Sequence, residues 1–238
     1  MPNRQRSGFI PTRFPGGINT TYPDWAMAMM GQPDPSRFIT DYDDFITYLA
    51  TDWAITTVGT GTRALAPGNG GILVITNSAA GTDSNYYQRA PGDFLMAANK
   101  RTFFKIRCQV DDATLADVQF GLINTDTTPL DATDGIWFRK AAGATTISVV
   151  VRKDATTGSS TIANVGAITT AMTEFAFAYD GKGEVDFYIN NARVGTIRNV
   201  LPSTFLPDAL LSTSFGVLNG SAVARSLTVD YVLAAQER

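Results

Sequence analysis

The stretch from Glu174 to Arg198, EFAFAYDGKGEVDFYINNARVGTIR, constrains the fold most, because it predicts three strands joined by two turns. In its first run, Phe175, Phe177 and Tyr179 occupy every second position, so they share one face of a strand. The DGKG sequence that follows tolerates the positive φ angles of a chain reversal, and Asn190-Asn191 suits a two-residue hairpin turn. The stretch therefore predicts a three-stranded antiparallel meander with one apolar face.

Strand patterns of this kind recur along most of the chain, from Trp53 to Ala235. Runs such as GILVITN, TFFKIRCQV, DVQFGLIN, IWFRK and TISVVVRKD alternate or are continuously apolar, and polar or glycine-containing turns separate them. Roughly a dozen short strands at this spacing are typical of a β-sandwich. A chain of 238 residues is long enough for one large domain of this class. We therefore predict an all-β fold, a two-sheet antiparallel sandwich.

One segment predicts a helix instead. Residues 41–51 read DYDDFITYLAT, with acids crowded into the first turn. Asp41 is a suitable N-cap, and Phe45, Tyr48 and Leu49 fall at positions i, i+3 and i+4 of one helical face. We expect this short helix to cover an open end of the sandwich.

The N-terminal segment, residues 1–36, has a different composition from the rest. Its many prolines and glycines exclude a long helix and most sheet pairing, so we expect an extended arm that precedes a sandwich domain at residues 37–238. The arm nevertheless carries large apolar groups and arginine, which require a surface to cover them, either on this domain or on a neighbouring subunit. The candidate partner-binding residues are Phe9, Arg13, Phe14, Trp25, Met27, Met29 and Met30.

The absence of histidine excludes several chemistries. Without it the chain has no Ser-His-Asp or Cys-His catalysis and no histidine-bound zinc. The single cysteine, Cys108, alternates with Ile106 and Val110, which indicates a buried apolar position and not a reactive thiol. We therefore predict no enzymatic activity, no catalytic or cofactor-binding residues, no metal and no cofactor.

Charge and hydropathy argue against nucleic-acid and membrane partners and against secretion. The net charge of −3 gives no electrostatic basis for nucleic-acid binding. No apolar run approaches the ~20 residues of a transmembrane helix. The opening sequence MPNRQRSGFIPTRFPGG has no apolar core of a secretory signal, so we expect synthesis in the cytoplasm.

Two sets of residues resemble known families. The meander, with its Y-D-G turn, is similar to the central hairpin of concanavalin-like and laminin-G-like jelly rolls. A second resemblance covers residues 50–238 and is to tailed-phage proteins that decorate or cement an icosahedral capsid. It is carried by the segments FFKIRCQVDDATLADVQFGLINTDT, DGIWFRK, ISVVVRKD and SLTVDYVLAAQE. The resemblance implies a structural virion protein at the capsid surface of a phage, which binds across capsid-subunit seams. The implied partners are the major capsid protein and copies of this chain in a homo-oligomer.

A carbohydrate-binding, lectin-like module of a phage tail fibre or other surface protein is the alternative function. If Ile136 and Phe138 face the core, Trp137 and Arg139 face outward, where they could stack on a sugar or anchor a protein contact. A glycoside hydrolase is disfavoured: Glu184 and Asp186 share one strand face, but no second glutamate follows them as the paired-carboxylate mechanism requires.

Calcium is the metal that the sequence would favour, if any. The acids Asp126, Asp131 and Asp134 share one loop. In the jelly-roll families that this chain resembles, oxygen-rich loops often hold calcium. Their spacing matches no EF-hand, and acidic loops are usually solvated. A metal site is therefore not predicted.

Overall fold

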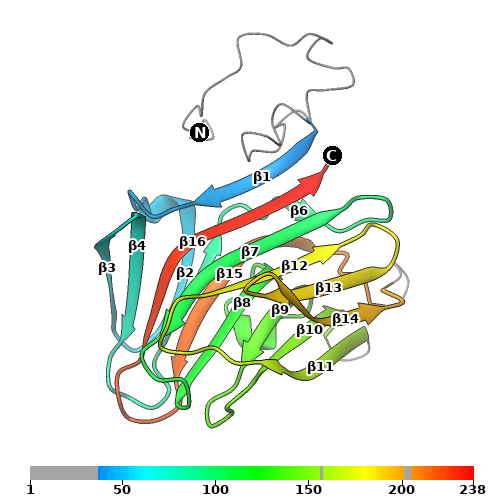
Figure 1. Ribbon diagram of the computed structural model, residues 1–238. Helices are drawn as coiled ribbons and strands as arrows, with labels where there is room; N and C mark the ends of the chain where they lie inside the picture. Colours follow the sequence, from blue (N-terminus) through cyan, green and yellow to red (C-terminus); the bar gives the residue numbers. More distant parts are fainter. Residues whose placement is uncertain (1–36, 156–157, 201–204) are drawn as a thin grey trace.

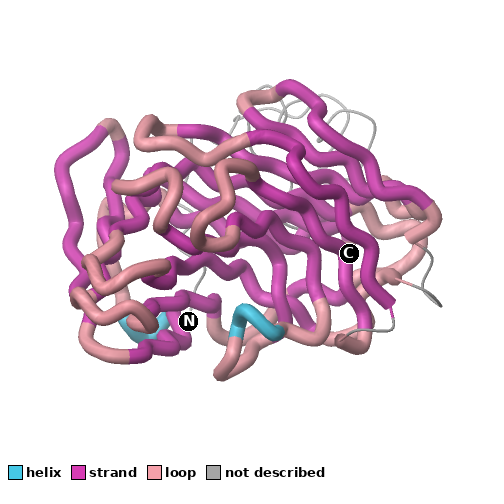
Figure 2. Tube along the Cα trace, turned by 90° about the horizontal axis from the view of Figure 1, so that it is seen from below, coloured by secondary structure: helices cyan, strands magenta, loops and turns pink. Residues whose placement is uncertain are grey.

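The computed structural model describes residues 37–155, 158–200 and 205–238. Within them, two eight-stranded antiparallel sheets pack face to face, which confirms the predicted all-β sandwich (Figure 1). Strands joined by loops make up the tube in Figure 2, and the described helices are 3-10 turns at Ala50–Asp52 and Pro129–Asp131. None of the described helices is long and apolar enough to cross a membrane.

The first sheet has β7 and β16 at its centre, in the order β14-β13-β12-β7-β16-β4-β3. Strand β16 pairs with β7 on one side, while on the other side β4 pairs with its first half and β1 with its second half. The strands are β1 (Phe38–Asp43), β3 (Gly61–Gly68), β4 (Gly70–Asn77), β7 (Thr102–Val110), β12 (Thr173–Tyr179), β13 (Glu184–Ile189), β14 (Ala192–Arg198) and β16 (Ser226–Glu237).

The second sheet has the order β11-β10-β9-β8-β15-β5-β2, and the two-residue strand β6 pairs with the start of β15. Its strands are β2 (Trp53–Val58), β5 (Ser84–Arg89), β6 (Phe94–Leu95), β8 (Ala116–Asn124), β9 (Gly135–Lys140), β10 (Ile147–Lys153), β11 (Gly158–Gly166) and β15 (Leu210–Asn219).

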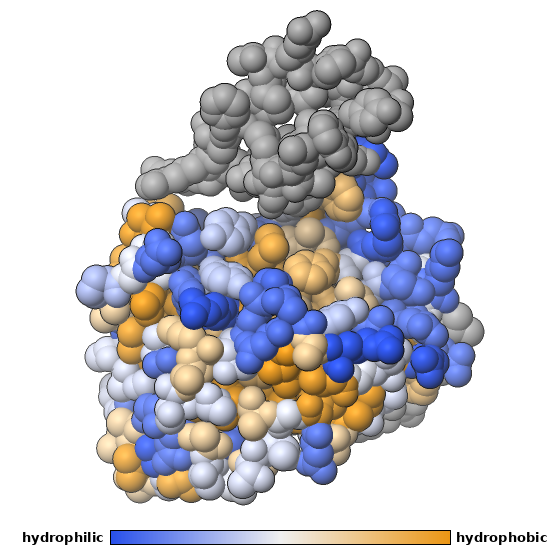
Figure 3. Space-filling view, viewed as in Figure 1, coloured by the Kyte–Doolittle hydropathy of each residue, from blue (hydrophilic) through white to orange (hydrophobic). Residues whose placement is uncertain are grey.

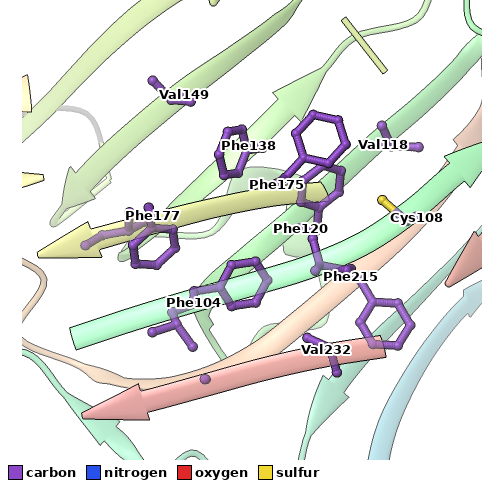
Figure 4. Close-up of a cluster of buried hydrophobic side chains, with 14 of the residues drawn as sticks. Phe104, Cys108, Val118, Phe120, Phe138, Val149, Phe175, Phe177, Phe215 and Val232 are labelled. Carbon is purple, nitrogen blue, oxygen red and sulfur yellow. The ribbon is translucent and has the colours of Figure 1, made fainter. Parts of the chain in front are cut away.

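Aromatic rings from both sheets form the centre of the core (Figure 4). The Phe138 ring from the second sheet lies 5.5 Å from the rings of Phe175 and Phe187 in the first sheet, and 5.5 Å from Phe120 in its own sheet. Cys108 is fully buried, and this burial raises the pKa of its thiol, as expected for a small core residue. The alternation along each strand therefore places its inward residues as the sequence predicted.

The predicted meander is present as β12, β13 and β14. Asn190 and Asn191 both have positive φ, 47° and 64°, as a primed two-residue turn requires. At the first turn, the Asp180 carboxylate accepts hydrogen bonds from the backbone amides of Lys182, Gly183 and Glu184.

The predicted helix at residues 41–51 is wrong. Its first residues belong to β1, where Asp41 pairs with Ala234 of β16. Asp43 then ends the strand: its carboxylate accepts a hydrogen bond from the Phe45 amide, and Phe45 takes a positive φ of 51°. This turn buries the Phe45 ring against Trp53 and Phe215, a gain in aromatic packing that outweighs the local helix propensity.

Arg89 sits beside the carboxylates of this segment. Its guanidinium lies 3.2 Å from Asp41, 3.5 Å from Asp43 and 3.7 Å from Asp52, and it also covers the Trp53 ring. Burial nevertheless raises the pKa of Asp43 to about 6, against the opposing effects of the Phe45 amide and Arg89.

This raised pKa predicts a pH-dependent stability. Because the pKa of Asp43 is higher in the folded state than in the unfolded state, the folded state binds more protons between pH 3.8 and about 6. Its stabilising contribution is complete below 3.8 and is lost as the pH rises through 6, a change of at most roughly 3 kcal/mol. Asp43→Asn keeps an acceptor for the Phe45 amide but does not titrate. In urea denaturation, the free energy of unfolding of the wild type should therefore fall relative to Asp43→Asn between pH 4 and pH 7. Parallel pH profiles would contradict this assignment.

Candidate functional site

Trp137 lies on the outer face of the second sheet, as its alternation with Ile136 and Phe138 predicts, but it is not exposed. Only 2% of its surface is accessible. It packs in a small cluster with Ile123, Ala132 and Val150, and the Arg152 guanidinium lies 5.2 Å from its ring centroid. The predicted exposure of Trp137 is therefore wrong.

The cause is the loop that follows β8, at residues 125–134, which folds back over this face. The side-chain amide of Gln119 donates to the Pro129 carbonyl at 2.7 Å, and the Asp126 amide donates to Gln88 at 3.0 Å. Pro129 and Ala132 are buried beneath the loop surface. The acids of this segment suggest a solvated loop, but its apolar residues Pro129 and Ala132 cover Trp137.

Arg139 is half-buried and forms hydrogen bonds with neighbouring side chains on the same face. Its guanidinium donates to the Asp117 carboxylate at 2.8 Å and to the Gln119 side-chain carbonyl at 3.1 Å. Burial raises the pKa of Asp117, although Arg139 opposes the rise. Burial also raises the pKa of the adjacent Tyr86. This polar layer fills the face, and the role of Arg139 as a partner contact stays a prediction.

The other predicted contact residues belong to the arm. Phe9, Arg13, Phe14, Trp25, Met27, Met29 and Met30 lie outside the described residues. Their role at a capsid or at another copy of this chain stays a prediction.

An open concavity lies on the outer face of the first sheet, near the start of β7. Two adjoining hollows of about 370 and 330 Å³ share Arg101 and Asp180 in their walls. We call the pair the β7 hollow. Charged and apolar residues lie side by side on the face shown in Figure 3. The residues of the β7 hollow are Phe38, Asn99, Arg101, Thr102, Phe103, Ala178, Tyr179, Asp180, Lys182, Asp186, Ala235 and Glu237.

The floor of the β7 hollow is one row of side chains across four strands. Phe103 of β7 pairs with Ala235 of β16 on one side and with Ala178 of β12 on the other, and Ala178 pairs with Asp186 of β13. The two alanines are small, so Phe103 rises between methyl groups and remains half-buried. The row thus presents one aromatic side chain and, on the far side of Ala178, one carboxylate.

The rim supplies charged hydrogen-bonding groups. Arg101 donates to Glu237 from both its backbone amide, at 2.8 Å, and its guanidinium, at 2.9 Å. The hydrogen bond from this guanidinium is the main reason that the pKa of Glu237 is lowered. At Asp180, partial burial raises the pKa, but hydrogen bonds from three backbone amides outweigh this effect. The pKa of Asp180 is therefore lowered as well. Both carboxylates are therefore ionised acceptors at neutral pH.

The two acids of β13 are on this same outer face, as predicted. Glu184 is exposed and lies 3.0 Å from Arg198. Asp186 accepts a hydrogen bond from the Thr196 hydroxyl and lines the β7 hollow. No second glutamate follows Asp186 on this strand, but Asp180 and Glu237 reach the same hollow from other segments. Phe103, Arg101 and Glu237 were missed because only the pairing of β7 with β16 brings them together.

The three acids of the loop after β8 do not converge. Asp126 accepts hydrogen bonds from Thr128 within its own turn, and Asp131 is exposed. Asp134 instead lies near Asp154 and Asp208, which come from other parts of the chain.

No protein-family model and no curated protein matches this sequence. Solved structures do match its fold. An endo-1,3-β-glucanase from Streptomyces sioyaensis has a TM-score of 0.61 at 12% identity, over 85% of this chain and 98% of that one. An endo-β-1,4-glucuronan lyase from Trichoderma reesei has a TM-score of 0.56 at 13% identity, over 82% and 94%. The carbohydrate recognition domain of Emp47p has a TM-score of 0.54 at 10% identity, over 84% and 97%.

The glucanase and the lyase overturn the prediction that this chain is not an enzyme. Glycan-active enzymes have the same fold over nearly their whole length. The prediction also relied on a missing second acid, yet the β7 hollow holds three carboxylates, Asp180, Asp186 and Glu237. The exclusion of enzymatic activity is therefore withdrawn.

The capsid interpretation stays a prediction. What the sequence resemblance and the structural neighbours share is the architecture, a sandwich of two packed antiparallel sheets. The chain therefore has a concanavalin-like jelly-roll fold.

Proposed function

We propose that this chain is a carbohydrate-binding module that takes a neutral polysaccharide in the β7 hollow. The observation that carries the proposal is the row of Phe103, Ala178 and Asp186, in which an aromatic side chain and a carboxylate line one open hollow on either side of an alanine. Structural neighbours that include a carbohydrate recognition domain and a glucanase support the same class of ligand.

The chemistry of a sugar ring matches this arrangement. One face of a pyranose is lined by C–H groups, which pack on an aromatic side chain, while its hydroxyls point outward around the ring. Asp186, Asp180 and Glu237 are acceptors at the edge of the hollow, and Arg101 is a donor. A binding site of this kind combines an apolar floor with a few placed polar groups.

The charge of the hollow favours a neutral sugar over an acidic one. Its walls hold two cationic side chains, Arg101 and Lys182, against three carboxylates, Asp180, Asp186 and Glu237. Arg101 is already bonded to Glu237. An anionic glycan would therefore meet a net negative surface, whereas hydroxyl groups can donate to the carboxylates without a charge penalty.

Phe103→Ala tests the proposal directly. Calorimetry against a panel of neutral and acidic polysaccharides measures binding to the wild type and the variant. We expect the dissociation constant of the variant for a neutral β-glucan to be at least tenfold higher than that of the wild type. The loss of the aromatic floor removes about 1.4 kcal/mol or more of binding free energy. Phe103 is on the outer face of its sheet, so circular dichroism and the melting temperature should change little.

Leu210→Ala is the matched control, because Leu210 is an exposed apolar residue on a strand of the other sheet. It should bind the same glucan as tightly as the wild type. If no neutral polysaccharide of the panel binds the wild type, the proposed function is wrong. If Leu210→Ala weakens binding as much as Phe103→Ala, the ligand is not in the β7 hollow. Release of reducing ends, followed in the same samples, would reveal cleavage of the bound chain.

A further inference from the structure

Three carboxylates meet at one end of the second sheet, away from the β7 hollow. Asp134 directly precedes β9, Asp154 directly follows β10, and Asp208 lies two residues before β15. Each offers an oxygen within 4.8 Å of those of the other two. The antiparallel pairing of β9 with β10 brings the first two together, since Gly135 is opposite Arg152.

Asp134 is the fixed member of this group. Its backbone amide donates to the Asn124 side chain at 3.1 Å, and its carbonyl accepts from the Asn124 amide at 3.0 Å. Only 4% of its surface is accessible, and its Oδ1 atom is buried with no hydrogen-bond partner among the described residues. A buried carboxylate oxygen without a partner carries a large desolvation cost unless a cation or a donor compensates it.

The formal charge of the group is negative. Lys153 places its ammonium 2.8 Å from Asp208, and this hydrogen bond, with the charges of Asp154 and Asp134, raises the pKa of the lysine. Three carboxylates against this one ammonium leave a net charge of −2. The neighbouring Arg152 instead donates to the Ala132 carbonyl and covers Trp137.

We propose that Asp134, Asp154 and Asp208 bind a divalent cation, and that the ion is Ca²⁺. Hard carboxylate oxygens are its preferred ligands, and it tolerates irregular geometry with water completing the shell. Ligands at about 2.3–2.6 Å from Ca²⁺ are at most about 5 Å apart, which accommodates separations up to 4.8 Å. Mg²⁺, with ligands at about 2.0–2.1 Å in an octahedron, demands a tighter arrangement. Asp154 and Asp208 are exposed, so the ion can enter from solvent.

The test uses the full chain after treatment with a chelator. Titration with CaCl₂ in a calorimeter should show one saturable site, and calcium should raise the melting temperature, because the ion binds only the folded arrangement. MgCl₂ should bind at least tenfold more weakly. An absence of calcium binding to the wild type would overturn the proposal, and tighter binding of magnesium would overturn the choice of ion.

Two variants locate the site. Asp134→Asn should weaken calcium binding at least tenfold, whereas Asp131→Asn, which removes an exposed acid from the same loop, should change it less than twofold. If Asp134→Asn fails to fold, Asp208→Asn replaces it, because this side chain is 60% exposed. Calcium affinity equal to the wild type in the variant tested, or an equal loss in Asp131→Asn, would overturn the assignment. These outcomes do not depend on whether a polysaccharide binds the β7 hollow.

Discussion

Replacing Trp137 with alanine is expected to lower the free energy of unfolding by about 3–5 kcal/mol. The side chain is buried with Ile123, Ala132 and Val150 between the second sheet and the loop that folds over it. Its removal leaves a cavity that the paired strands cannot close, because Gly121 and Gly135 already bring their backbones against the Trp137 side chain. Urea denaturation of the two proteins at one pH measures the difference.

An exposed aromatic residue provides the control. Tyr42 is 58% exposed on β1, and Tyr42→Ala should change the free energy of unfolding by no more than about 1 kcal/mol. A surface anchor would behave like Tyr42. If Trp137→Ala is as mild as Tyr42→Ala, then Trp137 is exposed in solution and its interpretation as a binding contact returns.

The second large effect is expected from Asn219→Ala, with a loss of about 3–5 kcal/mol in the free energy of unfolding. Asn219 is fully buried and closes one end of the sandwich: its amide donates to the carbonyls of Ser78 and Ala80, and its oxygen accepts from Asn77 and from the Arg225 backbone. Alanine would leave four polar groups without this partner. A buried group left unpaired, such as the Arg225 amide, costs about 1–3 kcal/mol, whereas water recovers part of the loss at the Ser78 and Ala80 carbonyls and Asn77 keeps its bonds to Asp83 and Val217.

Asn69→Ala is the control for this variant, because Asn69 is an exposed residue in the turn between β3 and β4. Its effect should stay within about 0.5 kcal/mol. The urea dependence of unfolding should keep the same slope in both variants, since the surface exposed on unfolding is unchanged. A loss below about 1 kcal/mol for Asn219→Ala would show that solvent already reaches this end of the sandwich.

Local sequence patterns predict this fold well where the structure depends on neighbours in the chain. The meander from Glu174 to Arg198 was predicted with its faces and turns, because alternation and the φ preferences of Asn190-Asn191 are local properties. The segment at residues 41–51 failed for the opposite reason. Its charges match a helix start, but pairing of β1 with β16 and burial of Phe45 decide its conformation.

The candidate sites were harder to predict, because they are assembled from distant segments. Phe103 and Glu237 share the β7 hollow only through the register of β7 with β16. Asp134 meets Asp154 and Asp208 across two loops, whereas the sequence suggested Asp126 and Asp131 as its neighbours. Alternation correctly placed Trp137 on the outer face, yet no local pattern shows that the preceding loop, residues 125–134, covers that face.

The position of β16 has a consequence for how the chain folds. This strand comes after all the other described strands in chain order, yet it lies in the middle of the first sheet and pairs with β7, β4 and β1. During synthesis, the edges of β7 and β4 therefore stay unpaired until residues 226–237 leave the ribosome. Such edges are sites where another chain can add a strand. Contacts between residues so far apart in sequence also make assembly slow. We infer that nascent copies of this protein are most prone to aggregation before residues 226–237 have emerged.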